Sequence, residues 1–183
     1  MDLILDIFNY TLTAILIGVC GAWIFLLKSM LDSFRLTPYL DKFENTSKTN
    51  PKVSIILPAR NEEEFIGKCL DSLLKQDYEN YEIIVIDDSS EDKTGEIISE
   101  YSKKYPKIIP VSARPKPDGW MGKNWACMEG YGKATGELLL FTDADTKHAE
   151  NVISLAVSHL NSFGLDALSA IPKMLTFDFW TNI

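Results

Sequence analysis

Two apolar runs that each end in a pair of carboxylates constrain the fold of this chain most strongly. Residues 83–86 lead directly into Asp87 and Asp88, and residues 138–142 lead into Asp143 and Asp145. Runs this apolar are typical of strands that are covered on both faces, as in a parallel α/β sheet. Open sheets of this class bind ligands in the crevice at the carboxyl ends of their strands. We therefore expect both acidic pairs at one ligand-binding edge of a mainly parallel sheet.

The spacing of the second pair indicates its chemistry. Two carboxylates one residue apart, Asp143 and Asp145, suit a hard divalent cation, which can in turn hold a phosphate-bearing substrate. The alternative is that both pairs are helix N-caps and solvated turns, where Asp is common. Two pairs on two strands of one sheet favour the ligand-binding interpretation.

Strand and helix patterns alternate along the rest of the domain. A helix is expected over 63–76, where apolar residues from Phe65 to Leu74 recur at the spacing of one helical face. The remaining apolar and capping patterns predict strands at 53–58, 108–111 and 167–171, a loop over 114–122, and helices at about 89–105, 124–134 and 149–162. This alternation predicts βαβ units and a mainly parallel sheet.

Residues 7–27 differ in kind, because these 21 residues carry no charge. A helix of that length spans roughly 30 Å, the thickness of a bilayer's hydrocarbon core. The chain starts with acidic residues, whereas a cleaved signal peptide starts with basic ones. Lys28 and Arg35 lie after the run and no Lys or Arg precedes it, so the positive-inside rule places the chain from Lys28 onward in the cytoplasm. We expect an uncleaved, single-pass anchor in the cell membrane over 1–35; the alternative is a buried helix of a soluble core.

Composition limits the remaining possibilities. The polar stretch 36–51 has the composition of a linker, and the α/β domain is expected over 52–183. A net charge of −8 argues against a nucleic-acid surface, which needs a basic stripe. The three cysteines are odd in number and lack CxxC spacing, so they fit a reducing compartment rather than a disulfide framework or a zinc site.

Four motifs, in order over roughly residues 52 to 175, resemble family 2 glycosyltransferases, which are inverting enzymes with the GT-A fold. They are Pro58-Ala59-Arg60-Asn61-Glu62, the stretch from Asp87 to Thr94, the stretch from Gly119 to Cys127 and Asp143-Ala144-Asp145. The third motif is similar to membrane-bound members that glycosylate lipids, such as the hopanoid, ceramide and carotenoid-acid glycosyltransferases. The resemblance implies a Rossmann-like nucleotide-diphospho-sugar transferase domain behind a transmembrane helix.

The resemblance also implies roles for individual residues. A nucleotide-sugar donor, in this family commonly a UDP-sugar, would contact Pro58, Arg60, Glu62, Asp87, Asp88, Lys123 and Asp143. Asp88 and Asp87 would lie at the base, because a carboxylate accepts a hydrogen bond from an imide NH. Asp145, with Asp143, would hold Mn²⁺ or Mg²⁺ on the diphosphate. Lys123, between a glycine-containing turn and a helix start, would meet the same phosphates. The acceptor would be a membrane lipid or another membrane molecule.

One part of the family pattern is missing. An inverting transferase needs a general base that takes the proton of the acceptor hydroxyl. In the family this Asp or Glu lies well downstream of the Asp-x-Asp motif, often before a Gln-x-x-Arg-Trp segment, and neither occurs before Ile183. We expect the base beyond Ile183, the acceptor half to be missing, and these residues alone to bind a donor without turnover.

Three other functions compete with this interpretation. The residues 143–146 (Asp-Ala-Asp-Thr) also resemble the Asp-x-Asp-x-Thr motif of haloacid-dehalogenase-like phosphatases, in which Asp143 would be the nucleophile. That motif normally opens its domain, whereas here the Asp87 pair and Lys123 precede it. A sugar nucleotidyltransferase should have a glycine-rich basic loop after its first strand, and residues 58–62 do not form one. A membrane-tethered nucleotide-sugar-binding module without turnover is the third alternative.

Overall fold

The computed structural model describes residues 2–36, 40 and 49–172. The chain divides into two compact units, Met1–Lys42 and Phe43–Ile183. Most of the predicted linker, 36–51, lies outside the described residues.

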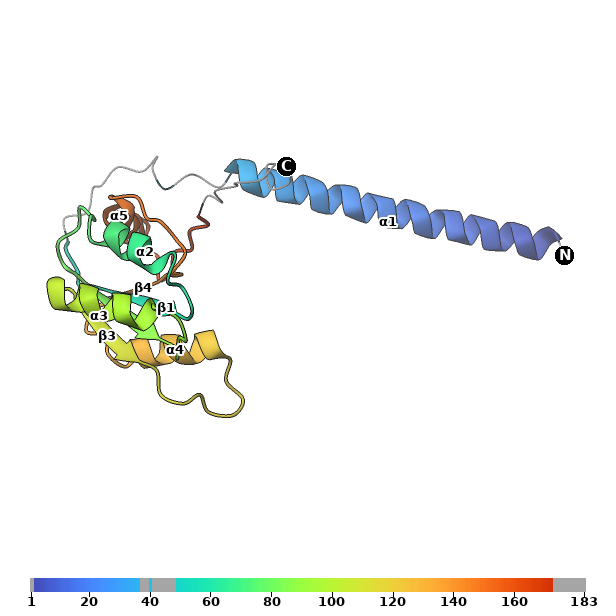
Figure 1. Ribbon diagram of the computed structural model, residues 1–183. Helices are drawn as coiled ribbons and strands as arrows, with labels where there is room; N and C mark the ends of the chain where they lie inside the picture. The colour runs from blue at the N-terminus through green and yellow to red at the C-terminus, as the bar shows by residue number, and fades with distance from the viewer. Residues whose placement is uncertain (1, 37–39, 41–48, 173–183) are drawn as a thin grey trace. The chain divides into compact units, whose positions relative to one another are not determined.

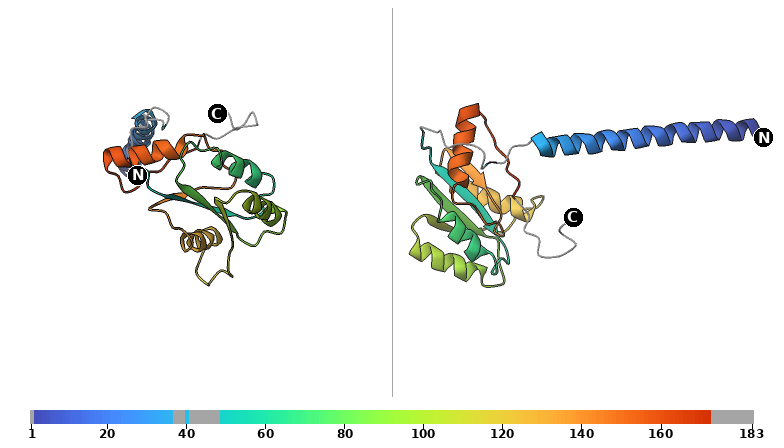
Figure 2. Two further views of the ribbon diagram at one scale, coloured as in Figure 1. Left: turned by 90° about the vertical axis from the view of Figure 1, so that its left-hand side faces the viewer. Right: turned by 90° about the horizontal axis from the view of Figure 1, so that it is seen from above.

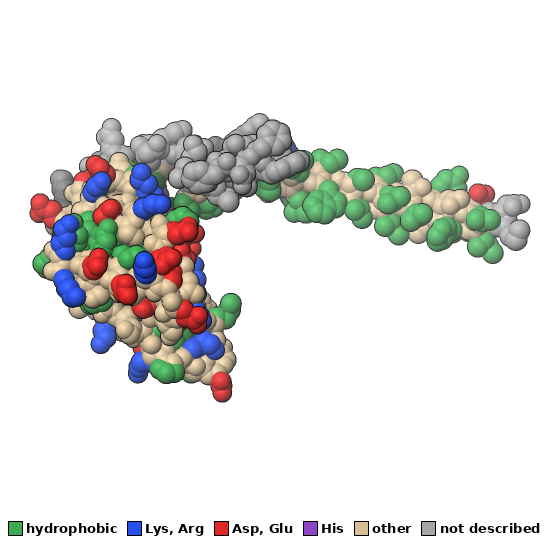
Figure 3. All heavy atoms as spheres, in the orientation of Figure 1, with side chains coloured by type: hydrophobic (Ala, Val, Ile, Leu, Met, Phe, Trp, Pro, Cys, Tyr) green, Lys and Arg blue, Asp and Glu red, His purple; other side chains and the backbone are tan. Residues whose placement is uncertain are grey.

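The first unit contains one long helix, α1 (Asp2–Leu36). Within its segment Leu3–Ser33, an 18-residue window has a mean hydropathy of 2.1. Among the described residues, this is the one helix long and apolar enough to cross a membrane. Figure 3 shows hydrophobic side chains along its visible surface. The predicted helix is thus present, and its insertion into a membrane stays a prediction that rests on length and composition.

The second unit is built on a four-stranded parallel sheet, as predicted. Its strands are β1 (Val53–Ala59), β2 (Tyr81–Asp87), β3 (Ile108–Ser112) and β4 (Leu138–Phe141), in the spatial order β3-β2-β1-β4. The strand order reverses between β1 and β4, which is the switch point where sheets of this type bind ligands.

Helices cover both faces of the sheet (Figures 1 and 2). On one face, α2 (Ile66–Leu73), α3 (Thr94–Lys104) and α5 (Val152–Phe163) pack with side chains such as Ile55 and Ile83. On the other face, Ala126 of α4 (Gly122–Tyr131) packs against alternate residues of the same strands, Ile56, Ile84 and Ile86. This alternation explains why these strands are apolar at every position.

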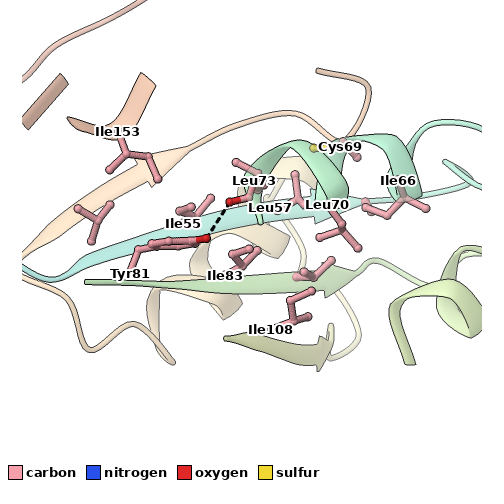
Figure 4. Close-up of a cluster of buried hydrophobic side chains, with 14 of the residues drawn as sticks. Ile55, Leu57, Ile66, Cys69, Leu70, Leu73, Tyr81, Ile83, Ile108 and Ile153 are labelled. Atoms are coloured by element: carbon pink, nitrogen blue, oxygen red, sulfur yellow. Dashed lines mark hydrogen bonds between the residues drawn. The ribbon is translucent and has the colours of Figure 1, made fainter. Parts of the chain in front are cut away.

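The larger cluster lies between α2 and the sheet, as Figure 4 shows. Leu70 and Leu73 are completely buried there, against Ile55 and Ile83. The Tyr81 hydroxyl enters the same cluster and donates a 2.9 Å hydrogen bond to the Leu73 carbonyl. The buried hydroxyl is therefore paired, and the bond joins α2 firmly to β2.

Three predicted features differ from the structure. The strand predicted at 167–171 is absent, because this segment forms no ladder with a neighbouring strand, and Ile171 is 88% exposed. β4 is not covered on both faces: α4 packs on β1 and β2, so Phe141 on β4 is 54% exposed. The predicted helix 63–76 begins only at Ile66, after a turn over 63–65.

Candidate functional site

Both acidic pairs leave the sheet at its carboxyl edge. Asp87 is the last residue of β2 and is level with Ala59, the last residue of β1. Phe141 ends β4 and is level with Ile56 of β1, and Asp143 comes two residues later. The loops after β1, β2 and β4 therefore meet beside the switch point.

The residue between the two metal-site candidates determines where they point. Ala144 is buried in the core, whereas Asp143 and Asp145 on either side of it are exposed. A backbone hydrogen bond of 3.3 Å from Thr146 N to Asp143 O closes a tight turn over the motif. The small buried alanine thus directs both carboxylates away from the core.

Lys123 lies next to this turn, as the resemblance implied. Its Nζ is 2.6 Å from Asp143 Oδ1, and the two side chains are 61% and 55% exposed. The hydrogen bond that Lys123 donates to Asp143 raises the pKa of Lys123. Ion pairs this exposed contribute little to stability, so the ammonium can exchange Asp143 for a phosphate at small cost.

The pair on β2 is held by its neighbouring loop. Asp87 Oδ1 accepts a hydrogen bond from Ser90 N at 3.0 Å, and Asp88 N donates to Ala59 O at 2.9 Å. Arg60 Nη1 lies 3.9 Å from Asp88 Oδ2, and the Arg60 side chain is 59% exposed. The Asp88 carboxylate, whose side chain is 16% exposed, is thus flanked by a cation.

Two helices begin directly beside these carboxylates. A Cβ atom added to Gly95, in the first turn of α3, would lie 2.8 Å from Asp87 Oδ2. One added to Gly122, the first residue of α4, would lie 3.2 Å from Asp88 Oδ2. Glycine therefore permits both helix N-termini, which favour negative charge, to approach the aspartates and any phosphate between them.

Hydrogen bonds cross-link the loops after β1 and β2. Asn61 N donates to Ser90 Oγ at 3.1 Å, and Glu91 N donates to Asn61 Oδ1 at 2.9 Å. Glu62 N donates to Thr94 Oγ1 at 2.8 Å. Asn61 and Ser89 both have left-handed backbones, with φ of 55° and 59°, a conformation that costs energy and is common at ligand sites. The two loops thus form one braced rim of the site.

Glu62 lies nearer to the metal-site candidates than the resemblance implied. Its pKa is raised first by burial and then by the negative charges of Asp145, Asp92 and Asp143. Glu62 therefore belongs electrostatically to the same acidic group as the Asp-x-Asp motif. Sequence reasoning placed it only with the nucleoside, because nothing local shows how far apart two loops lie.

Pro58 lies inside β1 rather than at its end. It is level with Ile86 of β2, and β1 continues to Ala59. The pairing with β4 stops earlier, at Ile56, so a residue without an NH is tolerated at this position. Pro58 contributes backbone shape to the site and no polar side chain.

The loop before α4 is anchored to the same rim. Ala113 N donates to Asp87 O at 3.0 Å, and Trp125 Nε1 donates to Arg114 O at 2.8 Å. The Arg114 guanidinium forms hydrogen bonds of 2.8 and 2.7 Å with Glu129. These contacts hold the start of α4, and with it Lys123, beside the carboxyl ends of β1 and β2.

A divalent cation fits the Asp-x-Asp turn only together with a ligand. Over residues 2–36, 40 and 49–172, no group of three His, Cys, Asp or Glu side chains is arranged to hold a metal. Mg²⁺ is commonly held by one or two carboxylates together with substrate phosphates and water. The two exposed carboxylates of the turn, beside a lysine at the start of α4, match that pattern.

His148 was given no role by sequence reasoning, and the structure gives it one contact of interest. Its ring Nε2 lies 3.0 Å from Thr142 Oγ1, at the residue before Asp143. Burial lowers the pKa of His148, so the ring is neutral at neutral pH. His148 Nε2 is thus engaged by Thr142 rather than directed at a metal site. The position of His148 in the sequence, three residues after Asp145, does not predict this contact.

Comparison with known proteins identifies the family. The Glycosyl transferase family 2 model matches residues 54–173, which include every candidate site residue. The chain belongs to glycosyl transferase family 2.

Relatives of this chain include proteins whose names contain a lipid. The chain is 37% identical over 111 residues to the 4,4'-diaponeurosporenoate glycosyltransferase of Staphylococcus haemolyticus, covering 60% of this chain and 28% of that protein. It is 35% identical over 105 residues to the beta-monoglucosyldiacylglycerol synthase of Trichormus variabilis, covering 56% and 22%. The chain thus spans about a quarter of the length of these family 2 relatives.

Two solved structures of transferases resemble the second unit. The mannosyltransferase PcManGT of Pyrobaculum calidifontis, in complex with GDP-Man and Mn²⁺, superposes with a TM-score of 0.59 at 26% identity, covering 74% of this chain and 39% of that one. S. aureus TarS 1–349 in complex with UDP gives 0.52 at 30% identity, covering 61% and 32%. The predicted GT-A fold is confirmed by these neighbours.

Proposed function

We propose that this chain carries the donor-binding domain of a membrane glycosyltransferase. The reaction moves a sugar from a nucleoside-diphosphate donor, a UDP-sugar in the first instance, to a lipid or other membrane acceptor with inversion. One observation carries the proposal: acidic pairs from the loops after β2 and β4 and a lysine at the start of α4 lie together at the switch point of a parallel sheet. Membership in glycosyl transferase family 2 argues against the phosphatase alternative, in which Asp143 would be a nucleophile.

The site residues divide between the two ends of the donor. Asp88, with Asp87 behind it, accepts the imide hydrogen bond of the base, and Arg60 and Glu62 border the nucleoside on the braced rim. Pro58 shapes the backbone of β1 just before this rim. Lys123 leaves Asp143 and pairs with the diphosphate, whose charge the N-terminus of α4 also stabilises.

Asp143 and Asp145 hold the divalent cation, Mn²⁺ or Mg²⁺, against the donor's phosphates. When bound, the cation stabilises the negative charge that grows on the leaving diphosphate. The acidic group that includes Glu62 draws a cation to this turn, because three carboxylates near one another repel. The structure of the mannosyltransferase PcManGT in complex with GDP-Man and Mn²⁺ supports the pairing of nucleotide and cation.

Calorimetry of the full chain in detergent tests the proposal. UDP, and in parallel GDP, is titrated with and without Mn²⁺. We expect Mn²⁺-dependent affinity for at least one nucleotide, and its loss in Asp145→Asn. Asp118→Asn, an exposed change in the loop before α4, is the matched control. Absence of Mn²⁺-dependent affinity for both nucleotides would refute the proposal.

A further inference from the structure

The five residues that carry the acidic motif, 143–147, are held at both of their ends. At the first end, Thr142, the residue after β4, donates through its N to Ile56 O of β1 at 3.2 Å. At the other end, His148 N donates to Ser72 Oγ of α2 at 3.0 Å. The His148 ring closes the loop on itself through its 3.0 Å contact with Thr142 Oγ1.

Ser72 is itself fixed within α2. Its hydroxyl donates to Cys69 O at 2.7 Å, which leaves its oxygen lone pairs to accept from His148 N. Ser72 is 6% exposed and Cys69 is 2% exposed. Cys69 Sγ lies 3.7 Å from Asp143 O, so the same helical turn also contacts the motif backbone.

The segment after His148 is tied to the same helix end. Gln76 Nε2 donates to Ala149 O at 2.6 Å, and Gln76 Oε1 accepts from Ile153 N at 3.2 Å. Asp77 N donates to Glu150 O at 2.8 Å. The C-terminal turn of α2 and the residues directly after it thus hold the connection between β4 and α5 by hydrogen bonds.

The side chains of the motif have no comparable support of their own. Asp143 and Asp145 are exposed, and Asp143 pairs with an exposed lysine. Their separation and direction therefore depend on the backbone of the turn. Metal sites in which the supporting groups are changed bind metal more weakly even when the ligands are intact.

We propose that His148 is a positioning residue for the cation: through Thr142 and Ser72 it fixes the turn that presents Asp143 and Asp145. The inference rests on the proposed function and adds to it a residue that never touches the metal. Loss of the His148–Thr142 hydrogen bond is expected to weaken cation-dependent nucleotide binding and to leave cation-independent binding unchanged.

The experiment uses isosteric and conservative pairs in the full chain in detergent. Thr142→Val removes the hydroxyl at constant shape, and Thr142→Ser keeps it. His148→Phe removes the ring nitrogens, and His148→Gln keeps a hydrogen-bonding group. Ser102→Ala, which removes a local hydrogen bond within α3, is the control. The probes are Mn²⁺ alone, followed by the electron paramagnetic resonance signal of free Mn²⁺, and UDP or GDP with Mn²⁺ or with EDTA.

We expect Thr142→Val and His148→Phe to weaken Mn²⁺-dependent nucleotide binding roughly three- to tenfold, the range of one hydrogen bond. Thr142→Ser should match the unmodified chain, and binding in EDTA should not change in any variant. If His148→Phe unfolds, the comparison of Thr142→Val with Thr142→Ser decides the question.

Two results have different meanings. Failure of the unmodified chain to bind nucleotide with Mn²⁺ would refute the proposed function and this inference with it. Normal binding by the unmodified chain, with Thr142→Val indistinguishable from it or equally weakened in EDTA, would refute the positioning role alone.

Discussion

At the scale of single residues, the pair of Lys123 and Asp143 combines two opposing requirements. In the proposed function, Lys123 neutralises the diphosphate and Asp143 binds the cation. In the structure the two side chains pair with each other, with 2.6 Å between Lys123 Nζ and Asp143 Oδ1. Both groups are exposed, so the exchange costs little.

Replacing Lys123 with Met should therefore change two affinities in opposite directions. The affinity for UDP or GDP with Mn²⁺ should fall about tenfold, because a charged hydrogen bond to phosphate is lost. The affinity for Mn²⁺ alone should hold or rise, because Asp143 loses a competing cation. Calorimetry and the resonance signal of free Mn²⁺ measure the two quantities, with Lys103→Met on α3 as the control. Equal weakening of both would contradict the exchange.

At the scale of elements, a buried carboxylate joins three segments at the edge of the sheet opposite the site. Glu82, at the start of β2, is 6% exposed. It accepts hydrogen bonds from Ser54 Oγ on β1 at 2.6 Å and from Thr135 N before β4 at 2.8 Å, and pairs with Lys52. Burial raises the pKa of Glu82, but the hydrogen bonds from these three partners outweigh it and lower the pKa to about 2.

This network predicts how the stability of the chain depends on pH. A free glutamate has a pKa near 4.5, so below that pH the unfolded chain takes up a proton before the folded chain does. The stability that Glu82 provides is thus complete above about pH 4.5 and is lost as the pH falls toward 2. The loss is at most about 3 kcal/mol.

Urea unfolding of the full chain in detergent, at several pH values, tests this. Glu82→Gln should lower the free energy of unfolding at pH 7 and flatten its decline between pH 4.5 and 2. Glu100→Gln, at an exposed position of α3, should leave both unchanged. An equally steep decline in Glu82→Gln would show that other carboxylates cause it.

The elements also show which features a sequence can predict. The strands β1 to β4 and the helices between them can be predicted from apolar runs and local spacing. The later start of the helix predicted at 63–76 cannot be predicted in this way. Glu63 N donates to the Asp92 carboxylate at 3.1 Å, and the Glu63 carboxylate accepts from Lys93 N at 3.0 Å. A distant loop thus holds this backbone in a turn.

The candidate site divides in the same way. Asp87, Asp88, Asp143 and Asp145 were predictable, because each lies at or just after a strand end. The contacts of Lys123 with Asp143 and of His148 with Ser72 could not be predicted, because they join residues 20 and 76 positions apart in the sequence. The second contact depends on how α2 packs. The exposed face of β4 could not be predicted either, because an apolar run does not indicate whether one or both faces of a strand are covered.

At the scale of the whole molecule, the two units impose different requirements on their surroundings. The segment Leu3–Ser33, at about 1.5 Å per residue, is longer than the roughly 30 Å hydrocarbon core of a bilayer. In the proposed function, the second unit binds a charged, water-soluble donor. We infer that α1 anchors the chain in the cell membrane and that the donor site faces the cytoplasm.

Integration itself should depend on the middle of α1. Leu16→Asp places a charge at the centre of the apolar segment, where an acidic residue costs about 3 kcal/mol. This variant should be released from membranes by alkaline carbonate far more readily than the unmodified chain. Leu31→Asp, near the end of the segment, is the matched control and should remain in the membrane pellet. Release of the unmodified chain under the same conditions would contradict integration.

The orientation should depend on the charges that flank the helix. Lys28 and Arg35 lie toward the end of α1, whereas Asp2 and Asp6 lie at its start. Because basic residues are retained on the cytoplasmic side, exchanging these charges (Asp2→Lys and Asp6→Lys with Lys28→Gln and Arg35→Gln) should invert a substantial fraction of molecules. Protease added outside intact cells should then digest the second unit of the variant and spare that of the unmodified chain. Digestion of the unmodified chain would place the second unit outside the cell and contradict the inferred cytoplasmic donor site. Protection of the unmodified chain and of the variant would show that the flanking charges do not set the orientation.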